Sequence, residues 1–158
     1  MTSGQSPHST LDQLARQARH LLISLDGPIR SASTGNPPTP YIHDVLTACR
    51  ESGRSVAVVS AAPVAEVLAY IDAHDLSAQI TIVAASIGRA VSALEALPID
   101  CMAITSSPDD IEAARAAGVP AVAYARTPDF ADHLLRAGAK AFVYSMLDLA
   151  IKLRSTVG

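Results

Sequence analysis

The amino-acid sequence predicts an α/β fold of the Rossmann-like type, a three-layer sandwich in which a mostly parallel sheet carries helices on both faces. Short apolar segments of strand length alternate along the chain with longer segments of helical period. The strand segments are apolar almost throughout, as expected for parallel strands that are covered on both faces. With 158 residues, 49% of them hydrophobic, the chain is large enough to bury one such core.

The first strand is predicted at residues 21–25, after a short amphipathic helix at residues 11–19. Further strands are predicted at residues 56–60, 80–84, 102–105, 119–124 and 141–144. The longer segments predict helices at residues 41–52, 63–74, 87–97, 108–117, 129–137 and 146–154. Glycine, a common stop signal, follows three of these helices, at Gly53, Gly118 and Gly138.

The chain is predicted to form a single domain over residues 11–158, preceded by a flexible polar tail at residues 1–10. The tail lacks the basic start and the apolar run of a signal peptide, and no later apolar run has the length of a membrane span. A cytoplasmic location is therefore expected. Residues 31–40 are rich in Ser, Gly and Pro and predict a loop.

Charge and composition argue against several kinds of partner. The net charge is -3 and the basic residues are scattered, so neither nucleic acid nor an anionic membrane is expected to bind. The histidines lack the spacing of metal ligands, which argues against a zinc site. Cys49 and Cys101 are predicted to be two buried thiols rather than a disulfide.

Polar residues follow three of the predicted strands. Ser24 and Asp26 lie at the end of the first strand. Ser60 ends the second strand, and residues 105–110 (TSSPDD) follow the fourth. Because ligands bind outside the carboxyl ends of parallel strands, these residues form the candidate site.

Three stretches of the sequence resemble the haloacid dehalogenase superfamily. They are an apolar strand followed by SLDGP, a second strand ending in VAVVSAAP, and the stretch CMAITSSPDDIEAARAAGVPAVAYA. The resemblance covers residues 21–149 and implies the Rossmann-like fold. It also implies phosphoryl transfer through an aspartate nucleophile with the help of Mg2+.

Some residues match the pattern that the resemblance implies, and others depart from it. Ser24 stands where active members carry the nucleophilic aspartate, whereas Asp26 matches their general acid and base. Ser60 matches the hydroxyl that binds the transferred phosphoryl group. No lysine matches the phosphate-binding lysine, because Lys140 and Lys152 both lie beyond the fourth motif.

The fourth motif has changed as well. Ser106 stands where the resemblance implies a Mg2+-binding aspartate, while Asp110 is retained. Neutral hydroxyls are poor ligands for Mg2+ because they bring no compensating charge. We therefore expect no cofactor and no metal site, with Mg2+ bound only if the protein is an active hydrolase.

The same residues also have structural interpretations. Ser107 can cap the helix that follows it, and Asp110 can serve in the first turn of that helix. Ser60 can cap the helix after the second strand, and Asp26 can belong to a turn. Both interpretations stay open, and the candidate ligand-binding residues are Ser60, Ser106, Ser107 and Asp110.

The preferred hypothesis is a pseudoenzyme with a haloacid dehalogenase-like fold and no cap domain, since only the loop 31–40 stands where relatives insert a cap. Its role would be protein interaction, regulation or metal-independent binding of a small anionic ligand. The uncovered crevice also predicts a homo-oligomer or a protein partner. The alternative is a hydrolase with weak or altered activity on a small phosphate ester, using Asp26 and Ser24. A receiver domain of a response regulator is a weaker alternative, because its acidic cluster and late lysine are not evident.

Overall fold

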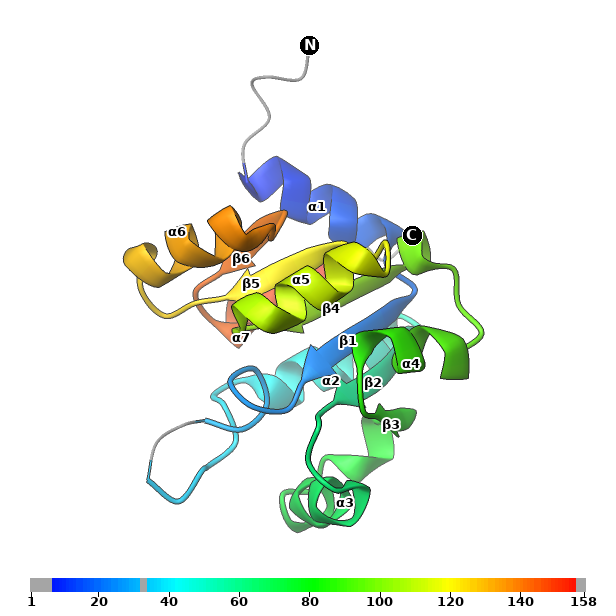
Figure 1. The fold of residues 1–158 in the computed structure, drawn as a ribbon. Coiled ribbons are helices and arrows are strands. Elements are labelled where there is room, and N and C mark those ends of the chain that lie inside the picture. Colours follow the sequence, from blue (N-terminus) through cyan, green and yellow to red (C-terminus); the bar gives the residue numbers. More distant parts are fainter. Residues whose placement is uncertain (1–6, 32–33, 156–158) are drawn as a thin grey trace.

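A six-stranded sheet lies between two layers of helices in the computed structural model, which describes residues 7–31 and 34–155 (Figure 1). The strands are β1 (His20–Ser24), β2 (Ser55–Val59), β3 (Ile82–Ala84), β4 (Cys101–Thr105), β5 (Ala121–Tyr124) and β6 (Ala141–Val143). Their order in the sheet is β3-β2-β1-β4-β5-β6, and every pairing between them is parallel. The predicted Rossmann-like fold is confirmed.

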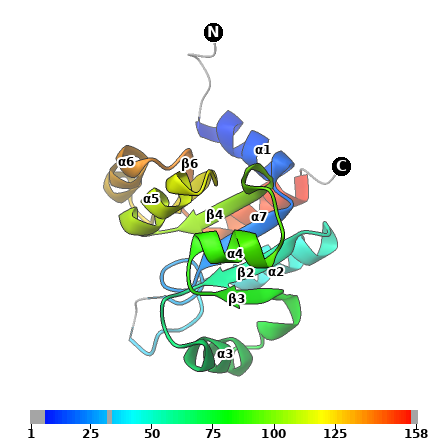
Figure 2. The same cartoon turned by 45° about the vertical axis from the view of Figure 1, so that its right-hand side comes forward.

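Helices cover both faces of this sheet (Figure 2). They are α1 (Pro7–Gln17), α2 (Ile42–Glu51), α3 (Val64–Ala73), α4 (Ile87–Ala93), α5 (Pro108–Ala116), α6 (Pro128–Ala137) and α7 (Met146–Ser155). The first three and α7 contribute side chains to the core on one face, and α4, α5 and α6 contribute to the core on the other. No helix within the described residues is long and apolar enough to cross a lipid bilayer.

The central strand β1 shows why apolar runs become buried strands here. It lies between β2 and β4. Leu21 and Ile23 pack into the core on one face, whereas Leu22 packs into the core on the other. Successive side chains of a strand point to opposite faces, so a strand covered on both sides needs apolar residues at every position.

One predicted helix is shorter than expected. The helix predicted at residues 87–97 ends at Ala93. Glu95 adopts a left-handed conformation with φ 53°, and the Ala96 N–H donates to the Val91 carbonyl. This hydrogen-bond pattern is typical of helices that end at a residue in the left-handed conformation. That residue is usually glycine, which would have allowed the helix end to be predicted, but here it is a glutamate.

Other element boundaries also differ from the prediction by one to four residues. The strand predicted at residues 80–84 begins only at Ile82, because a turn of 3-10 helix precedes it. Helix α1 begins at Pro7, inside the stretch predicted as a flexible tail (residues 1–10). Residues 1–6 lie outside the described residues.

The connection from β1 to α2 contains neither a helix nor a named strand among its described residues. It folds as turns with two isolated bridges, which join Asp26 to Arg30 and Arg30 to Pro38. In Figure 1 this loop extends outward from the carboxyl end of β1. The described part of the connection contains no helical cap.

The two cysteines are buried and free, as predicted. Burial raises the pKa of the Cys49 thiol to about 12 and that of the Cys101 thiol to about 11. Only the thiolate is a strong nucleophile, so both side chains behave as packing residues at neutral pH.

Candidate functional site

The carboxyl ends of β1 and β4 bring most of the predicted site residues together. These strands are neighbours at the point where the strand order changes direction, which is where open α/β sheets bind ligands. Ser24 ends β1 and Thr105 ends β4, and both side chains are buried. The sheet topology therefore places the first and fourth motifs side by side.

Asp110 joins the two strand ends. The Ser24 hydroxyl donates to Asp110 Oδ2 at 3.0 Å, and the Thr105 hydroxyl donates to the same oxygen at 3.3 Å. Ser107 caps α5 by accepting from the Asp110 N–H at 3.4 Å, which confirms the capping interpretation of Ser107. The Asp110 carboxylate thus lies in the first turn of a helix, where negative charge is favourable, and two hydroxyl groups satisfy one of its oxygens.

Ser24 therefore contacts a different carboxylate from the one that the sequence suggests. Asp26 is the nearer acid along the chain, but the structure pairs Ser24 with Asp110, 86 positions away. The order of the strands brings these two residues together. A sequence signal for this contact exists only if β1 and β4 are already known to be adjacent.

Ser106 bonds elsewhere. Its hydroxyl donates to the Tyr124 carbonyl at 2.7 Å, so it joins the ends of β4 and β5. Gly27 lies against it with φ 99°, and a Cβ atom at that position would come within 2.9 Å of Ser106 Oγ. Position 27 therefore requires glycine for both its conformation and its lack of a side chain.

Asp26 is outside the Asp110 network and faces solvent. Its side chain is 71% exposed, and its Oδ1 atom lies 2.8 Å from Arg30 Nη2. The hydrogen bond from Arg30 to this carboxylate raises the pKa of the arginine. The Arg30 guanidinium also lies over the ring of Tyr70 on α3, 5.3 Å from its centroid. The residue that matches the general acid and base is thus held in an ion pair.

Ser60 lies just beyond β2, in a turn. Its hydroxyl accepts from the Ala62 N–H at 3.1 Å, whereas α3 begins after Pro63. The interpretation of Ser60 as the helix cap is therefore wrong, because the chain makes one more turn before the helix starts. Among the described residues, no hydrogen bond joins Ser60 to Ser24 or Asp110.

The residues present do not fit a Mg2+ centre. Within the described ranges, no group of three or more His, Cys, Asp or Glu side chains could hold a metal ion. Asp110 already accepts from two hydroxyls, and Asp26 is paired with Arg30. Mg2+ requires near-octahedral oxygen coordination and usually carboxylate charge. This arrangement supplies neither the ligand number nor the charge.

A cavity of about 340 Å3 opens beside the network, between the loop after β1 and the turn from β5 to α6. Gly27 and Ser106 line it on the side of the candidate site, and Arg126 and Phe130 line it from the start of α6. Arg126 and Phe130 were not among the predicted site residues. Their positions depend on how the β5–α6 turn lies relative to the loop after β1. No local sequence pattern predicts that arrangement.

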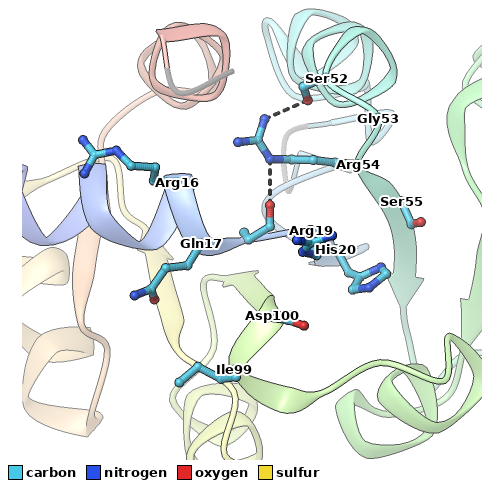
Figure 3. A pocket seen from close by; sticks show the side chains of 11 residues that line it. Arg16, Gln17, Arg19, His20, Ser52, Gly53, Arg54, Ser55, Ile99 and Asp100 are labelled. Atoms are coloured by element: carbon cyan, nitrogen blue, oxygen red, sulfur yellow. Dashed lines mark hydrogen bonds between the residues drawn. The ribbon is translucent and has the colours of Figure 1, made fainter. Parts of the chain in front are cut away.

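A larger depression, of about 800 Å3, lies at the opposite, amino end of the sheet (Figure 3). Arg54 lines it and donates to the carbonyls of Ala15, Ala18 and Leu153, in the last turns of α1 and α7 or just beyond. Cations are favourable at helix carboxyl ends, so this arginine has a structural task. Although this depression is larger than the cavity beside the network, we do not assign it as the ligand site, because none of the predicted site residues line it.

Solved structures share the fold. A protein from Thermotoga maritima assigned as a beta-phosphoglucomutase aligns with a TM-score of 0.75 and 13% identity, over 86% of this chain and 100% of its own. A haloacid dehalogenase-like hydrolase from Streptococcus pneumoniae aligns with a TM-score of 0.71 and 11% identity, over 85% and 98%. A predicted phosphatase from Clostridium acetobutylicum aligns with a TM-score of 0.64 and 18% identity, over 73% and 59%.

At these identities the likeness establishes the fold, which is haloacid dehalogenase-like, as the sequence motifs imply. No protein-family model matches the sequence, and no curated protein matches it.

Proposed function

We propose that this protein is a non-catalytic domain of haloacid dehalogenase-like fold that serves protein interaction, regulation or metal-independent ligand binding. The observation that supports this most is the closed network around Asp110, which accepts from both Ser24 and Thr105. A catalytic carboxylate at this position would have to be available to a metal or a substrate. Here it holds the ends of two strands together.

The chemistry of phosphoryl transfer supports the same proposal. Catalysis depends on positioning the phosphoryl group and neutralising its oxygens. Ser24 carries no charge and has a shorter side chain than the aspartate that the resemblance implies. Asp26 is bound by Arg30, and Ser106 is bound to a backbone carbonyl. Each group that could take part already has a structural partner.

The experiment that tests the proposal is Mg2+ titration by calorimetry, with a phosphatase panel, on the wild type and on Ser24→Asp/Ser106→Asp. We expect neither binding nor turnover in the wild type, and Mg2+ binding in the double variant. Because a new carboxylate at position 24 would crowd Asp110, the double variant should also show a melting temperature that rises when Mg2+ is added.

The matched control is Ser24→Asp/Ser107→Asp, which adds the same charge but places the second acid at the helix cap. It should show a smaller response to Mg2+. Saturable phosphate release by the wild type, dependent on Mg2+, would contradict the proposal.

A hydrolase with weak or altered activity on a small phosphate ester is the second candidate function. The observation that favours it is the 3.0 Å hydrogen bond from Ser24 to Asp110, since a serine nucleophile needs an adjacent base. This candidate predicts phosphate release that both Ser24→Ala and Asp110→Asn abolish. Asp26→Asn would reduce it as well if Asp26 acts as the acid. Release that none of the three changes comes from a contaminant.

Self-association or a protein partner, expected from the uncovered crevice, stays a prediction. Sedimentation velocity over a wide range of concentration should show a sedimentation coefficient that rises with concentration. A monomer at every concentration would contradict a homo-oligomer.

A further inference from the structure

The cavity beside the candidate site has the position and size of a small-molecule site. It lies at the carboxyl ends of β4 and β5, next to the point where the strand order changes direction. Near the ends of β1 and β4, Gly27 packs directly against Ser106. The cavity, about 340 Å3, is near the lower limit of known ligand pockets, which is roughly 300 Å3.

The polar groups near Gly27 are satisfied within the protein. Ser106 donates to the Tyr124 carbonyl at 2.7 Å, and the buried Thr39 donates to the Gly27 carbonyl at 2.8 Å. The second bond also holds the end of the first loop, so that Pro40 becomes part of the wall. A ligand would therefore meet a preformed and mostly apolar surface, since hydroxyls with good partners gain little from exchanging them.

The opposite wall combines a ring with a cation. Phe130 is 38% exposed, and its ring stacks on that of His133 with centroids 6.1 Å apart. Arg126 also lines the cavity, and within residues 7–31 and 34–155 its guanidinium has no hydrogen bond or ion pair. The Thr127 hydroxyl accepts from the Phe130 N–H as the cap of α6. Arg126 therefore supplies the charge on this wall.

We propose that this cavity binds a small apolar monoanion of the aromatic carboxylate class, whose carboxylate pairs with Arg126 while its ring packs against Pro40 and Phe130. The inference rests on the proposed function in one respect, that the occupant is a ligand and not a substrate. A guanidinium matches a carboxylate with two parallel hydrogen bonds. Apolar contacts supply the rest of the affinity.

A phosphate group fits this cavity less well. Phosphate carries a charge between about -1.5 and -2 at neutral pH and three strong acceptor oxygens, which require several donors. Arg126 brings only one positive charge to this wall, and the hydroxyls of Thr39 and Ser106 already donate within the protein. The wall residues therefore select a singly charged ligand with an apolar body.

The test is a titration of the full chain with benzoate, followed by amide chemical shifts. Benzamide, a neutral compound of the same shape, is the comparison ligand. Benzoate should shift the amides of Gly27, Thr39 and Thr127 and saturate. Benzamide should bind about tenfold more weakly or worse, and Arg126→Gln should weaken benzoate by a similar factor, because each removes a charged hydrogen bond.

Two further variants separate charge from shape. Phe130→Ala should weaken benzoate and benzamide alike, leaving their ratio unchanged. Arg89→Gln, an exposed arginine on α4 that does not line this cavity, should change neither. Shifts that do not saturate, that map elsewhere, or that survive Arg126→Gln would overturn the inference.

Inorganic phosphate with Mg2+ is titrated into the same sample. Saturable shifts at Ser24 and Asp110 would contradict the proposed function and leave benzoate binding as a separate result. Absence of benzoate binding would overturn the cavity inference and leave the proposed function standing.

Discussion

The two ends of the sheet carry opposite kinds of polar chemistry. At the carboxyl end, hydroxyl groups bond to carboxylate and carbonyl oxygens, as Ser24 and Thr105 do to Asp110. At the amino end, Arg54 bonds to backbone carbonyls of α1 and α7 and lies in a wide depression with other arginines (Figure 3). Both ends are polar, but only the carboxyl end holds the residues that the sequence motifs mark.

This difference follows from the direction of the helices. In a parallel α/β fold the helices begin near the carboxyl ends of the strands, so anions are favoured there and cations at the other end. Arg54 supplies such a cation at the amino end, where it donates to carbonyls at the end of α1. At the carboxyl end, Asp110 is itself an anion at the start of α5. The position where this fold favours a ligand anion is thus partly filled by the protein.

Among the variants that test this difference between the two ends of the sheet, Arg54→Ala is expected to lose the most stability. The change leaves three backbone carbonyls without their charged donor and should lower the free energy of unfolding by about 3 kcal/mol. Urea unfolding measures it. Arg50→Ala is the control, because Arg50 is exposed in the last turn of α2 and should cost less than about 0.5 kcal/mol. Equal losses of unfolding free energy in the two variants would mean that Arg54 stabilises the fold no more than an exposed arginine does.

A smaller effect is expected at the carboxyl end, from Asp110→Ala. It removes the shared acceptor of two buried hydroxyl groups and should cost about 2 kcal/mol of unfolding free energy. Asp109→Ala is the matched control, since Asp109 lies in the same first turn but is exposed. It should lose only the helix-dipole contribution, about 0.5 kcal/mol. If the two variants unfold alike, the network does not hold the strand ends together.

The smallest effect concerns pH and the thiol of Cys49, which lies at the amino end near Arg54. Burial raises its pKa from 9.0 to about 12. Below pH 9.0 the thiol is protonated in both states, so its contribution is fully present. Above that value the unfolded chain ionises first, and the free energy of unfolding falls by roughly 1.4 kcal/mol per pH unit until the folded thiol also ionises.

The measurement compares the wild type with Cys49→Ala between about pH 8 and about pH 10. The wild type should lose stability more steeply above about pH 9, and the difference in slope belongs to Cys49. Parallel curves would show that this thiol is accessible in the folded state.

Much of the fold could be predicted because it depends on local patterns. Apolar runs and helical periods located all six strands and all seven described helices, and Ser107 was recognised as a cap from its place before Pro108. Errors arose where a local signal was weak. The left-handed residue that ends α4 is Glu95, which carries no glycine-like signature.

The candidate site could be predicted only in part. Ser24, Ser106 and Asp110 were correctly placed at one end of the sheet, since parallel strands bring their carboxyl ends together. Their partners were not predicted. Ser106 bonds to a carbonyl of the next strand, and Asp26 forms an ion pair with Arg30.

The sequence by itself determined the fold class, the strand and helix pattern, two buried thiols and the departures from the catalytic motifs. Only the tertiary structure decided which side chains touch: Ser24 with Asp110, and Gly27 with Ser106 beside the cavity that Arg126 lines. The physical reason is that periodicity depends on neighbours along the chain. Contacts between loops depend on the order of the strands and on the packing of helix ends. Both are set by residues that lie far apart in the sequence.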